Sequence, residues 1–118
     1  MHRYKELKVW QKAIDLAVEV YRITELLPQN ERFGLISQMN RAVVSIPSNI
    51  AEGAGRNSLR EFDNFLGIAL GSSFELDSQL VISNRLSYVK NTDFDRLENH
   101  IEHLQNMIVK LKMSFENK

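Results

Sequence analysis

One line of polar side chains in the middle of the chain is the strongest candidate for a binding or interaction site. Its members recur every three or four residues, which places them on one face of a helix. They are Gln38, Arg41, Ser45, Asn49, Glu52 and Arg56. The line contains no Lys and is rich in short hydrogen-bonding groups. It suits a buried polar network with Glu75, a subunit interface, or a surface that meets phosphate, and a solvated face without Lys is the plain alternative.

Three arginines, Arg41, Arg56 and Arg60, are the candidate contacts for an anion or for RNA. Arg56 and Arg60 flank the expected start of a helix near residue 59, where unpaired amide protons and the helix dipole favour negative charge. Two ordinary solvated arginines would explain the same sequence. Because a guanidinium also binds a carboxylate through two parallel hydrogen bonds, the polar line is equally expected to form a cluster with Glu75 as its carboxylate partner.

Residues for catalysis or metal binding are sparse. The three histidines are His2, in a start that we expect to be flexible, and His100 and His103, three residues apart. The last two form a possible metal pair, but they flank an apolar stripe, so we expect a solvated helix shoulder. A di-iron bundle needs Glu-x-x-His on two helices, and neither histidine is preceded by such a Glu. We therefore predict no catalytic residue, no metal site and no cofactor.

Composition limits the class of protein. The chain has 118 residues, of which 43% are hydrophobic and 25% are charged, as in one soluble globular domain. Its 15 Lys and Arg balance 15 Asp and Glu, so global basicity gives no argument for nucleic acid, and there is no Cys. Uninterrupted apolar runs are far shorter than the roughly 18 residues that span a bilayer. We expect a cytoplasmic protein with no membrane contact and no small-molecule substrate.

Four helices are expected to position these residues. Apolar stripes with spacings of three and four predict helices at about 5–26, 31–53, 59–87 and 93–115. The three connections between them are short, and short connections force successive helices to run antiparallel. The expected architecture is therefore all-α, one domain over residues 1–118 that folds as an antiparallel up-down-up-down four-helix bundle.

Particular residues refine this expectation. We assign Trp10 and Tyr21 to the core side of the first helix rather than to base stacking. Pro47 lies inside the second helix, where its ring and missing amide proton predict a kink without a break. Gly67 and Gly71 form a notch of small residues on the third helix that would admit close approach of another helix.

Capping signals set the expected helix ends. Gly53 and Gly55 are expected to stop the second helix. Ser58 and Glu61 form a capping box at the start of the third helix. Thr92 is expected to cap the last helix, with two Asp in the first turn to complement the helix dipole.

Residues from most of the chain resemble one known family. They are the start Tyr4-x-x-Leu7-x-x-Trp10-x-x-Ala13, then Val20-Tyr21-x-x-Thr24, Leu27-Pro28, the block Gln38-x-x-Arg41-Ala42-x-x-Ser45-Ile46-x-x-Asn49-Ile50-Ala51-Glu52-Gly53-x-x-Arg56, and Ala69-x-Gly71-Ser72-x-x-Glu75-Leu76. Together they resemble the four-helix bundle proteins encoded in 23S rRNA intervening sequences, also called S23 ribosomal proteins. The resemblance also extends to the accessory variability protein of diversity-generating retroelements, a pentameric barrel that contacts nucleic acid and a reverse transcriptase.

The resemblance implies a bacterial, cytoplasmic, non-enzymatic bundle that forms a homo-oligomer, pentameric in known relatives. No catalytic residue is carried over from the family. The retroelement relative is basic, whereas this chain has a net charge of +0. We therefore expect a homo-oligomeric helical adapter that associates with RNA or with an RNA–protein complex. A protein-interaction scaffold with no nucleic-acid role is the alternative.

Overall fold

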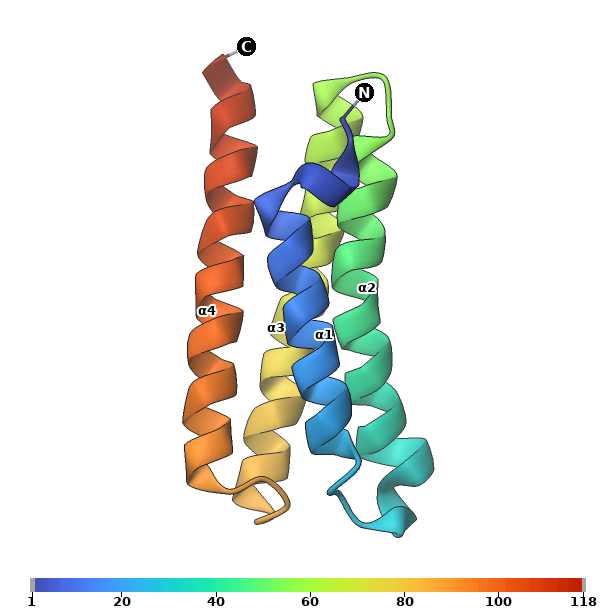
Figure 1. Ribbon diagram of the computed structural model, residues 1–118, viewed down its shortest axis with the longest axis vertical. Coiled ribbons are helices and arrows are strands. Elements are labelled where there is room, and N and C mark those ends of the chain that lie inside the picture. Colours follow the sequence, from blue (N-terminus) through green and yellow to red (C-terminus); the bar gives the residue numbers. More distant parts are fainter. Residues whose placement is uncertain (1, 118) are drawn as a thin grey trace.

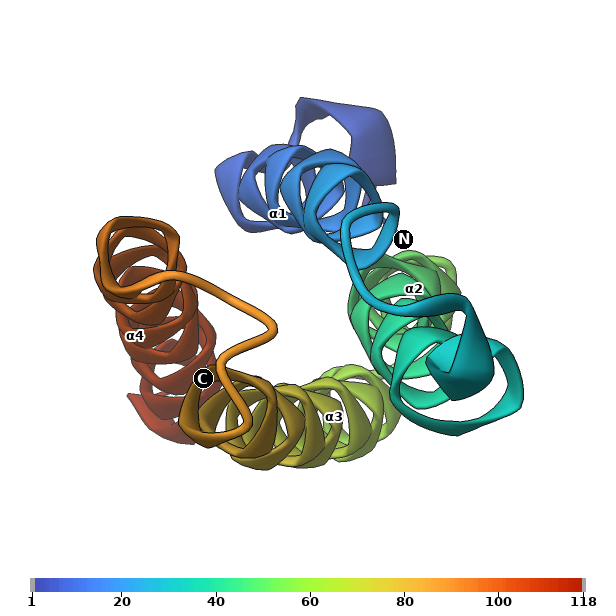
Figure 2. The ribbon, with the colours of Figure 1, turned by 90° about the horizontal axis from the view of Figure 1, so that it is seen from below.

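The computed structural model describes residues 2–117, which fold into a bundle of four long helices (Figure 1). They are α1 Lys8–Thr24, α2 Ser37–Ala54, α3 Leu59–Arg85 and α4 Asn91–Ser114, with short 3-10 turns at Tyr4–Glu6, Gln29–Glu31 and Phe115–Asn117 and a π turn at Arg32–Ile36. Successive helices run in opposite directions, and viewed end-on they surround the core in chain order (Figure 2). The prediction of an all-α, up-down-up-down bundle is confirmed.

The core lies along the axis between the helices, where each helix contributes aliphatic side chains. Leu16, Ile46, Leu76 and Leu104 are each 0% exposed. On α2, α3 and α4 the buried faces are the ones that the apolar stripes predict, which confirms those stripes. Since burial of one Leu or Ile side chain contributes about 1.5–3 kcal/mol, these stripes supply most of the driving force for packing.

The core face of α1 is rotated by one residue from the predicted face. Its buried residues are Val9, Ala13, Leu16, Val20, Ile23 and Thr24. Trp10 is half-buried against the edge of the core, whereas Tyr21 is 44% exposed, so the assignment of Tyr21 to the core was wrong. Residues 9, 13, 16 and 20 repeat with the same spacing as residues 10, 14, 17 and 21. Periodicity therefore could not choose between the two faces.

The connection between α1 and α2 is longer than expected. The second helix was predicted from residue 31, but α2 begins at Ser37, because the preceding turn contains Gly34 with φ −104° and ψ −110°, outside the helical region. The predicted limits at 5–26 and 59–87 extend a few residues beyond α1 and α3, whereas the helix predicted at 93–115 starts two residues after α4 does and ends one residue after it. Within α2, the helix continues through the buried Pro47, so the expectation that this residue does not break the helix is confirmed.

The predictions about helix ends had different outcomes, and Gly55 is the C-cap of α2 as predicted. Ser58 caps α3 as predicted, because its Oγ accepts the Glu61 amide proton at 3.2 Å. Thr92 is not a cap, since α4 begins one residue before it, at Asn91, without a side-chain cap. The His2 amide donates to the Ala54 carbonyl at 2.8 Å, which joins the start of the described residues to the end of α2.

Gly53 marks the closest approach between two helices. It lies inside α2 instead of ending it, and a β-carbon added there would lie 2.7 Å from Cβ of Phe65 on α3. A β-carbon at Gly71 would have nothing within 4 Å, and one at Gly67 would meet only the Lys112 Nζ, at 3.6 Å. No described helix of the same chain packs closely at Gly67 and Gly71, and close approach of a helix from a second copy stays a prediction. The helix contact that requires glycine is the one between α2 and α3.

The outer side of α3 exposes large apolar side chains. Ile68, Phe74, Ile82 and Leu86 are 52%, 54%, 49% and 51% exposed. By length and composition α3 is the one described helix that could cross a membrane, with 33% of its most apolar 18-residue window buried. A helix packed between two others in a bundle meets the same criterion, as α3 does between α2 and α4. The absence of membrane contact stays a prediction.

Candidate functional site

The α2 polar line, as we call Gln38, Arg41, Ser45, Asn49, Glu52 and Arg56, follows the outer groove between α2 and α3. Ser45 Oγ lies 2.8 Å from Ser72 Oγ of α3, which places the middle of the line at the helix contact. Ser45 and Asn49 are half-buried, whereas the other four members are exposed. The line is therefore neither a wholly buried network nor a wholly solvated face.

The half-buried middle of the line is a short hydrogen-bonded chain. The Asn49 amide donates to the Ser45 carbonyl at 2.8 Å and to Ser45 Oγ at 3.0 Å, and Ser45 in turn bonds to Ser72. Each such bond contributes on the order of 1 kcal/mol to stability. Because Ser45 and Ser72 meet at one height along the two helices, these hydrogen bonds also fix the register of α2 against α3.

Arg41 and Glu75 face one small recess from two helices but do not form a pair. The recess, of about 90 Å³, is lined by Arg41, Ala42, Ser45, Ser72 and Glu75. Arg41 Nη2 donates to Gln38 Oε1 at 2.8 Å, and no described residue forms an ion pair with Glu75. Both side chains are exposed. The expected cluster with Glu75 as carboxylate partner is therefore assembled in space without the expected ion pair within the chain.

The three arginines proposed as anion contacts do not converge. Arg56 Nη2 lies 3.7 Å from Glu52 Oε2, and its guanidinium carbon lies 4.9 Å from the centre of the Phe65 ring. Arg60 instead lines a different recess near the end of α4, together with Lys112. Arg41 and Arg56 are 15 residues apart on the chain, or roughly 22 Å along a helix. No single patch among the described residues gathers these three positive charges.

His100 is not the solvated residue that we expected. Its Nδ1 lies 2.5 Å from Glu19 Oε1, its side chain is 16% exposed, and it ties α4 to α1. Glu19 Oε2 also accepts from Arg96 Nε at 3.2 Å, and hydrogen bonds to Asp93 and Glu19 raise the pKa of Arg96. His103 is exposed, as expected. In the part of the chain that the structure describes, no three His, Cys, Asp or Glu form a group that could hold a metal ion.

A carboxyl pair at the α3–α4 contact was not predicted. Burial raises the pKa of Glu98 to about 7, and a hydrogen bond with Asp77 together with the charges of Asp77, Glu102 and Asp95 raises it in the same direction. Asp77 Oδ1 is buried and has no hydrogen-bond partner among the described residues. The only signal in the sequence was the run of like charges at residues 95, 98 and 102, because Asp77 is brought in by the fold.

This pair predicts that stability falls as pH rises. A carboxyl whose folded pKa exceeds its unfolded value binds its proton more tightly in the folded state. Ionisation of Glu98 therefore adds no penalty below the ordinary value of 4.5, and its full penalty is reached above about 7. As pH rises between these values, the melting temperature of Glu98→Gln should increase relative to that of the parent protein. A constant difference between the two melting curves across this range would contradict the prediction.

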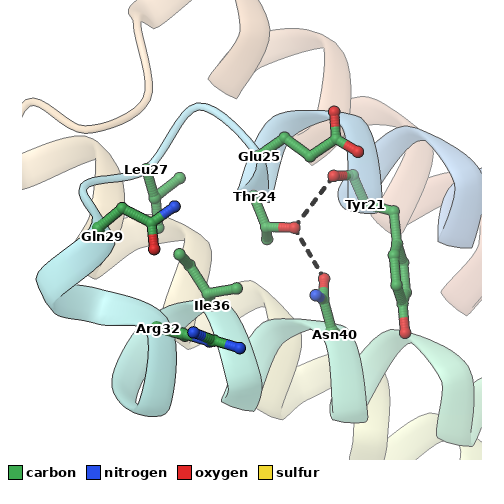
Figure 3. Close-up of a pocket in the computed structure, with 8 residues that line it drawn as sticks. All are labelled: Tyr21, Thr24, Glu25, Leu27, Gln29, Arg32, Ile36 and Asn40. Carbon is green, nitrogen blue, oxygen red and sulfur yellow. Dashed lines mark hydrogen bonds between the residues drawn. The ribbon is translucent and has the colours of Figure 1, made fainter.

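A larger recess lies where the end of α1 meets the connecting turns and α2 (Figure 3). It measures about 320 Å³ and is lined by Tyr21, Thr24, Glu25, Leu27, Gln29, Arg32, Ile36 and Asn40. Thr24 Oγ1 lies 3.1 Å from the Tyr21 carbonyl oxygen and 2.9 Å from Asn40 Oδ1, which joins α1 to α2 at the floor. The recess was not predicted, because its polar residues come from separate elements and share no spacing.

Fold and site together define a small helical-bundle protein that presents its polar groups in open grooves between helices. The chain belongs to the 23S rRNA-intervening sequence protein family, whose model matches residues 5–110. The family that the sequence resembles is thereby confirmed, while the relation to the retroelement protein stays a prediction.

A solved structure supports the same fold. It is the crystal structure of a protein of unknown function from the S23 ribosomal protein family of Bacteroides thetaiotaomicron. The two structures match with a TM-score of 0.82 at 24% sequence identity, over 88% of this chain and 97% of that chain. At this identity the likeness shows the fold alone. No curated protein matches the chain.

Proposed function

We propose that this protein is a non-enzymatic, homo-oligomeric adapter that associates with RNA or with an RNA–protein complex in the cytoplasm. The observation that carries the self-association is the outer groove of α2 and α3. There an exposed arginine and an exposed glutamate line one recess and form no ion pair with each other, beside apolar side chains that the described residues leave about half exposed. Such a mixture of apolar and complementary charged groups is typical of interfaces between proteins.

The apolar part of this face has the spacing of a helix-packing seam. Ile68, Glu75 and Ile82 follow one another at intervals of seven residues, so they lie on one side of α3. Val44 on α2 is 42% exposed and adds to the apolar surface near Arg41. A seam of this kind is stabilised when another helix packs on it. Because this seam is exposed in a single chain, we expect another protein segment to cover it.

The occupant that we propose is a second copy of this chain. The face offers both members of an ion pair, Arg41 and Glu75, so that Arg41 of one subunit can bind the carboxylate of the next. Arginine suits this role because its planar guanidinium can donate two parallel hydrogen bonds to one carboxylate. Because both residues line one recess, this contact is reciprocal between two copies, and the ring that the family resemblance leads us to expect would need a second contact surface besides it.

Light scattering after size-exclusion chromatography tests this assembly. The parent protein should have a mass several times 13.7 kDa, and Arg41→Glu or Glu75→Arg should lower that mass by placing like charges together. The double variant Arg41→Glu/Glu75→Arg should recover it, because the pair is restored with its signs exchanged. Arg22→Glu is the matched control, since Arg22 is an exposed arginine on α1, away from this groove.

Three outcomes would contradict parts of this proposal. A parent protein that runs as a monomer at tens of micromolar would overturn the proposed self-association. An oligomer that both single variants leave intact would show that copies meet through a different face. Loss of the oligomer in both single variants without recovery in the double variant would contradict the Arg41–Glu75 contact.

The rival function is a protein-interaction scaffold without nucleic acid. The balanced net charge and the separation of Arg41, Arg56 and Arg60 favour it, because phosphate binding draws on gathered positive charge. Purification from the native cell with and without ribonuclease separates the two functions. Partners that ribonuclease releases support the RNA-associated adapter, and partners that persist after complete RNA digestion support the scaffold.

A further inference from the structure

We propose that the recess between α1, the connecting turns and α2 binds an unpaired guanine base of single-stranded RNA. This inference rests on the RNA association proposed above and gives it a site. The recess holds about 320 Å³, close to the lower end of the range of roughly 300–1,000 Å³ in which small ligands bind. It lies at the end of the bundle where α1 leads into α2, apart from the groove between α2 and α3 (Figure 3).

The walls of the recess suit a flat aromatic ligand. Tyr21 lies on its rim and is 44% exposed, so the ring is available to stack on a base. Leu27 is buried and Ile36 is half-buried, and both line the recess as apolar surface. Exposed aromatic rings over such surfaces are the usual platforms for unstacked bases in single-stranded RNA.

The polar groups at the recess can select the base. Arg32 and the amides of Gln29 and Asn40 supply hydrogen-bond donors, and Glu25 supplies a carboxylate on the α1 side (Figure 3). Arg32 and Glu25 line one recess, yet neither forms an ion pair with a described residue. The Arg32 guanidinium carbon lies 5.4 Å from the centre of the Phe33 ring. Both charges are thus available to one ligand.

Guanine is the base whose edges match this set. Its O6 and N7 accept two hydrogen bonds, which is the pattern that arginine recognises, and its N2 amino group donates to a carboxylate. Adenine places an amino group where guanine has O6, and uracil and cytosine offer smaller surfaces for stacking on Tyr21. A free phosphate would lie beside Glu25 and be repelled, so the opposite charges of Arg32 and Glu25 favour a base over a bare anion.

Calorimetric titration of the full chain with each of the four nucleoside monophosphates tests the site. We expect guanosine monophosphate to bind at least tenfold more tightly than the other three, and inorganic phosphate not to bind detectably. Tyr21→Ala and Arg32→Gln should each weaken guanosine monophosphate about tenfold or more, through loss of stacking and of the bidentate contact respectively. Arg22→Gln, an exposed arginine on α1 that does not line the recess, should leave the affinity unchanged.

A second arm uses single-stranded RNA ten nucleotides long, with and without guanine. Preference for the guanine-containing RNA that is lost in Tyr21→Ala supports the site. Equal binding of the four monophosphates, or equal binding of phosphate, would overturn the inference. If RNA binds without regard to guanine or to Tyr21, the inference fails while the proposed function stands. If guanosine monophosphate binds selectively but neither RNA does, the site stands and the proposed function fails.

Discussion

Leu104→Ala is expected to lower the free energy of unfolding by about 2–5 kcal/mol. Leu104 is 0% exposed in the middle of the apolar stripe of α4. Truncation to Ala removes buried apolar atoms and leaves a cavity, and both effects destabilise the folded state. The cost is expected to approach the upper end of this range if the neighbouring core side chains cannot close around the gap. Urea unfolding followed by circular dichroism measures it.

Met113→Ala on the same helix is the control for that variant. Met113 is 57% exposed, so its truncation should change the free energy of unfolding by no more than about 0.5 kcal/mol. Equal losses in the two variants would mean that α4 does not bury the face that contains Leu104. A loss confined to Leu104→Ala would support the position of α4 in the bundle.

The fold could be predicted from the sequence because the apolar stripes of α2, α3 and α4 are unambiguous. On α3 the outer side is apolar as well, but the regular stripe through Leu66 and Leu76 is the one that the spacing predicts and the structure buries. On α1 two adjacent stripes are apolar, and the structure buries the one through Leu16 and leaves Tyr21 at the surface. Helix ends were less predictable, since Gly34 and Asn91 set them through local backbone geometry that spacing does not reveal.

The candidate sites show a sharper limit. The α2 polar line is visible in the sequence because five of its six residues belong to one helix and Arg56 follows shortly after that helix ends. The distance and rotation between α2 and α3 decide which of their side chains meet. Ser45 bonds to Ser72, whereas Arg41 and Glu75 line one recess without an ion pair. The Glu19–His100 contact and the Asp77–Glu98 pair each join residues from two helices, as does the recess of Tyr21 and Asn40. Such sites arise from packing and could not be found from spacing alone.

A long side of the molecule and one of its ends therefore carry different proposed roles. The groove that contains Arg41 and Glu75 runs along the bundle, where a long contact with a second copy can form. The recess that contains Tyr21 and Arg32 lies at one end of the bundle, where α1 leads into α2 (Figure 1). Assembly through the long face would leave these end recesses accessible, so that one oligomer would present several equivalent base-binding sites. Repeated weak sites increase avidity for a single RNA strand.

Gly53→Ala and Gly71→Ala are expected to change stability in opposite directions. Both replace a helical glycine with the best helix former, which by itself stabilises a helix by roughly 0.5–1 kcal/mol. At Gly71 nothing lies within 4 Å of the new methyl group, so that gain should be observed. At Gly53 the methyl group would lie 2.7 Å from Phe65 Cβ and 2.9 Å from Phe62 Cδ1, which α2 and α3 can relieve only by moving apart.

The resulting overpacking at Gly53 should cost typically 1–3 kcal/mol. Because Gly71 lies on the outer side of α3, between Ile68 and Glu75, both variants are best measured in the Glu75→Arg background, where the proposed assembly is disrupted. Urea unfolding should then shift to lower concentration for Gly53→Ala and to higher concentration for Gly71→Ala. Stabilisation by both substitutions would contradict the close contact between α2 and α3, since only the helix propensity of Ala would remain to explain it.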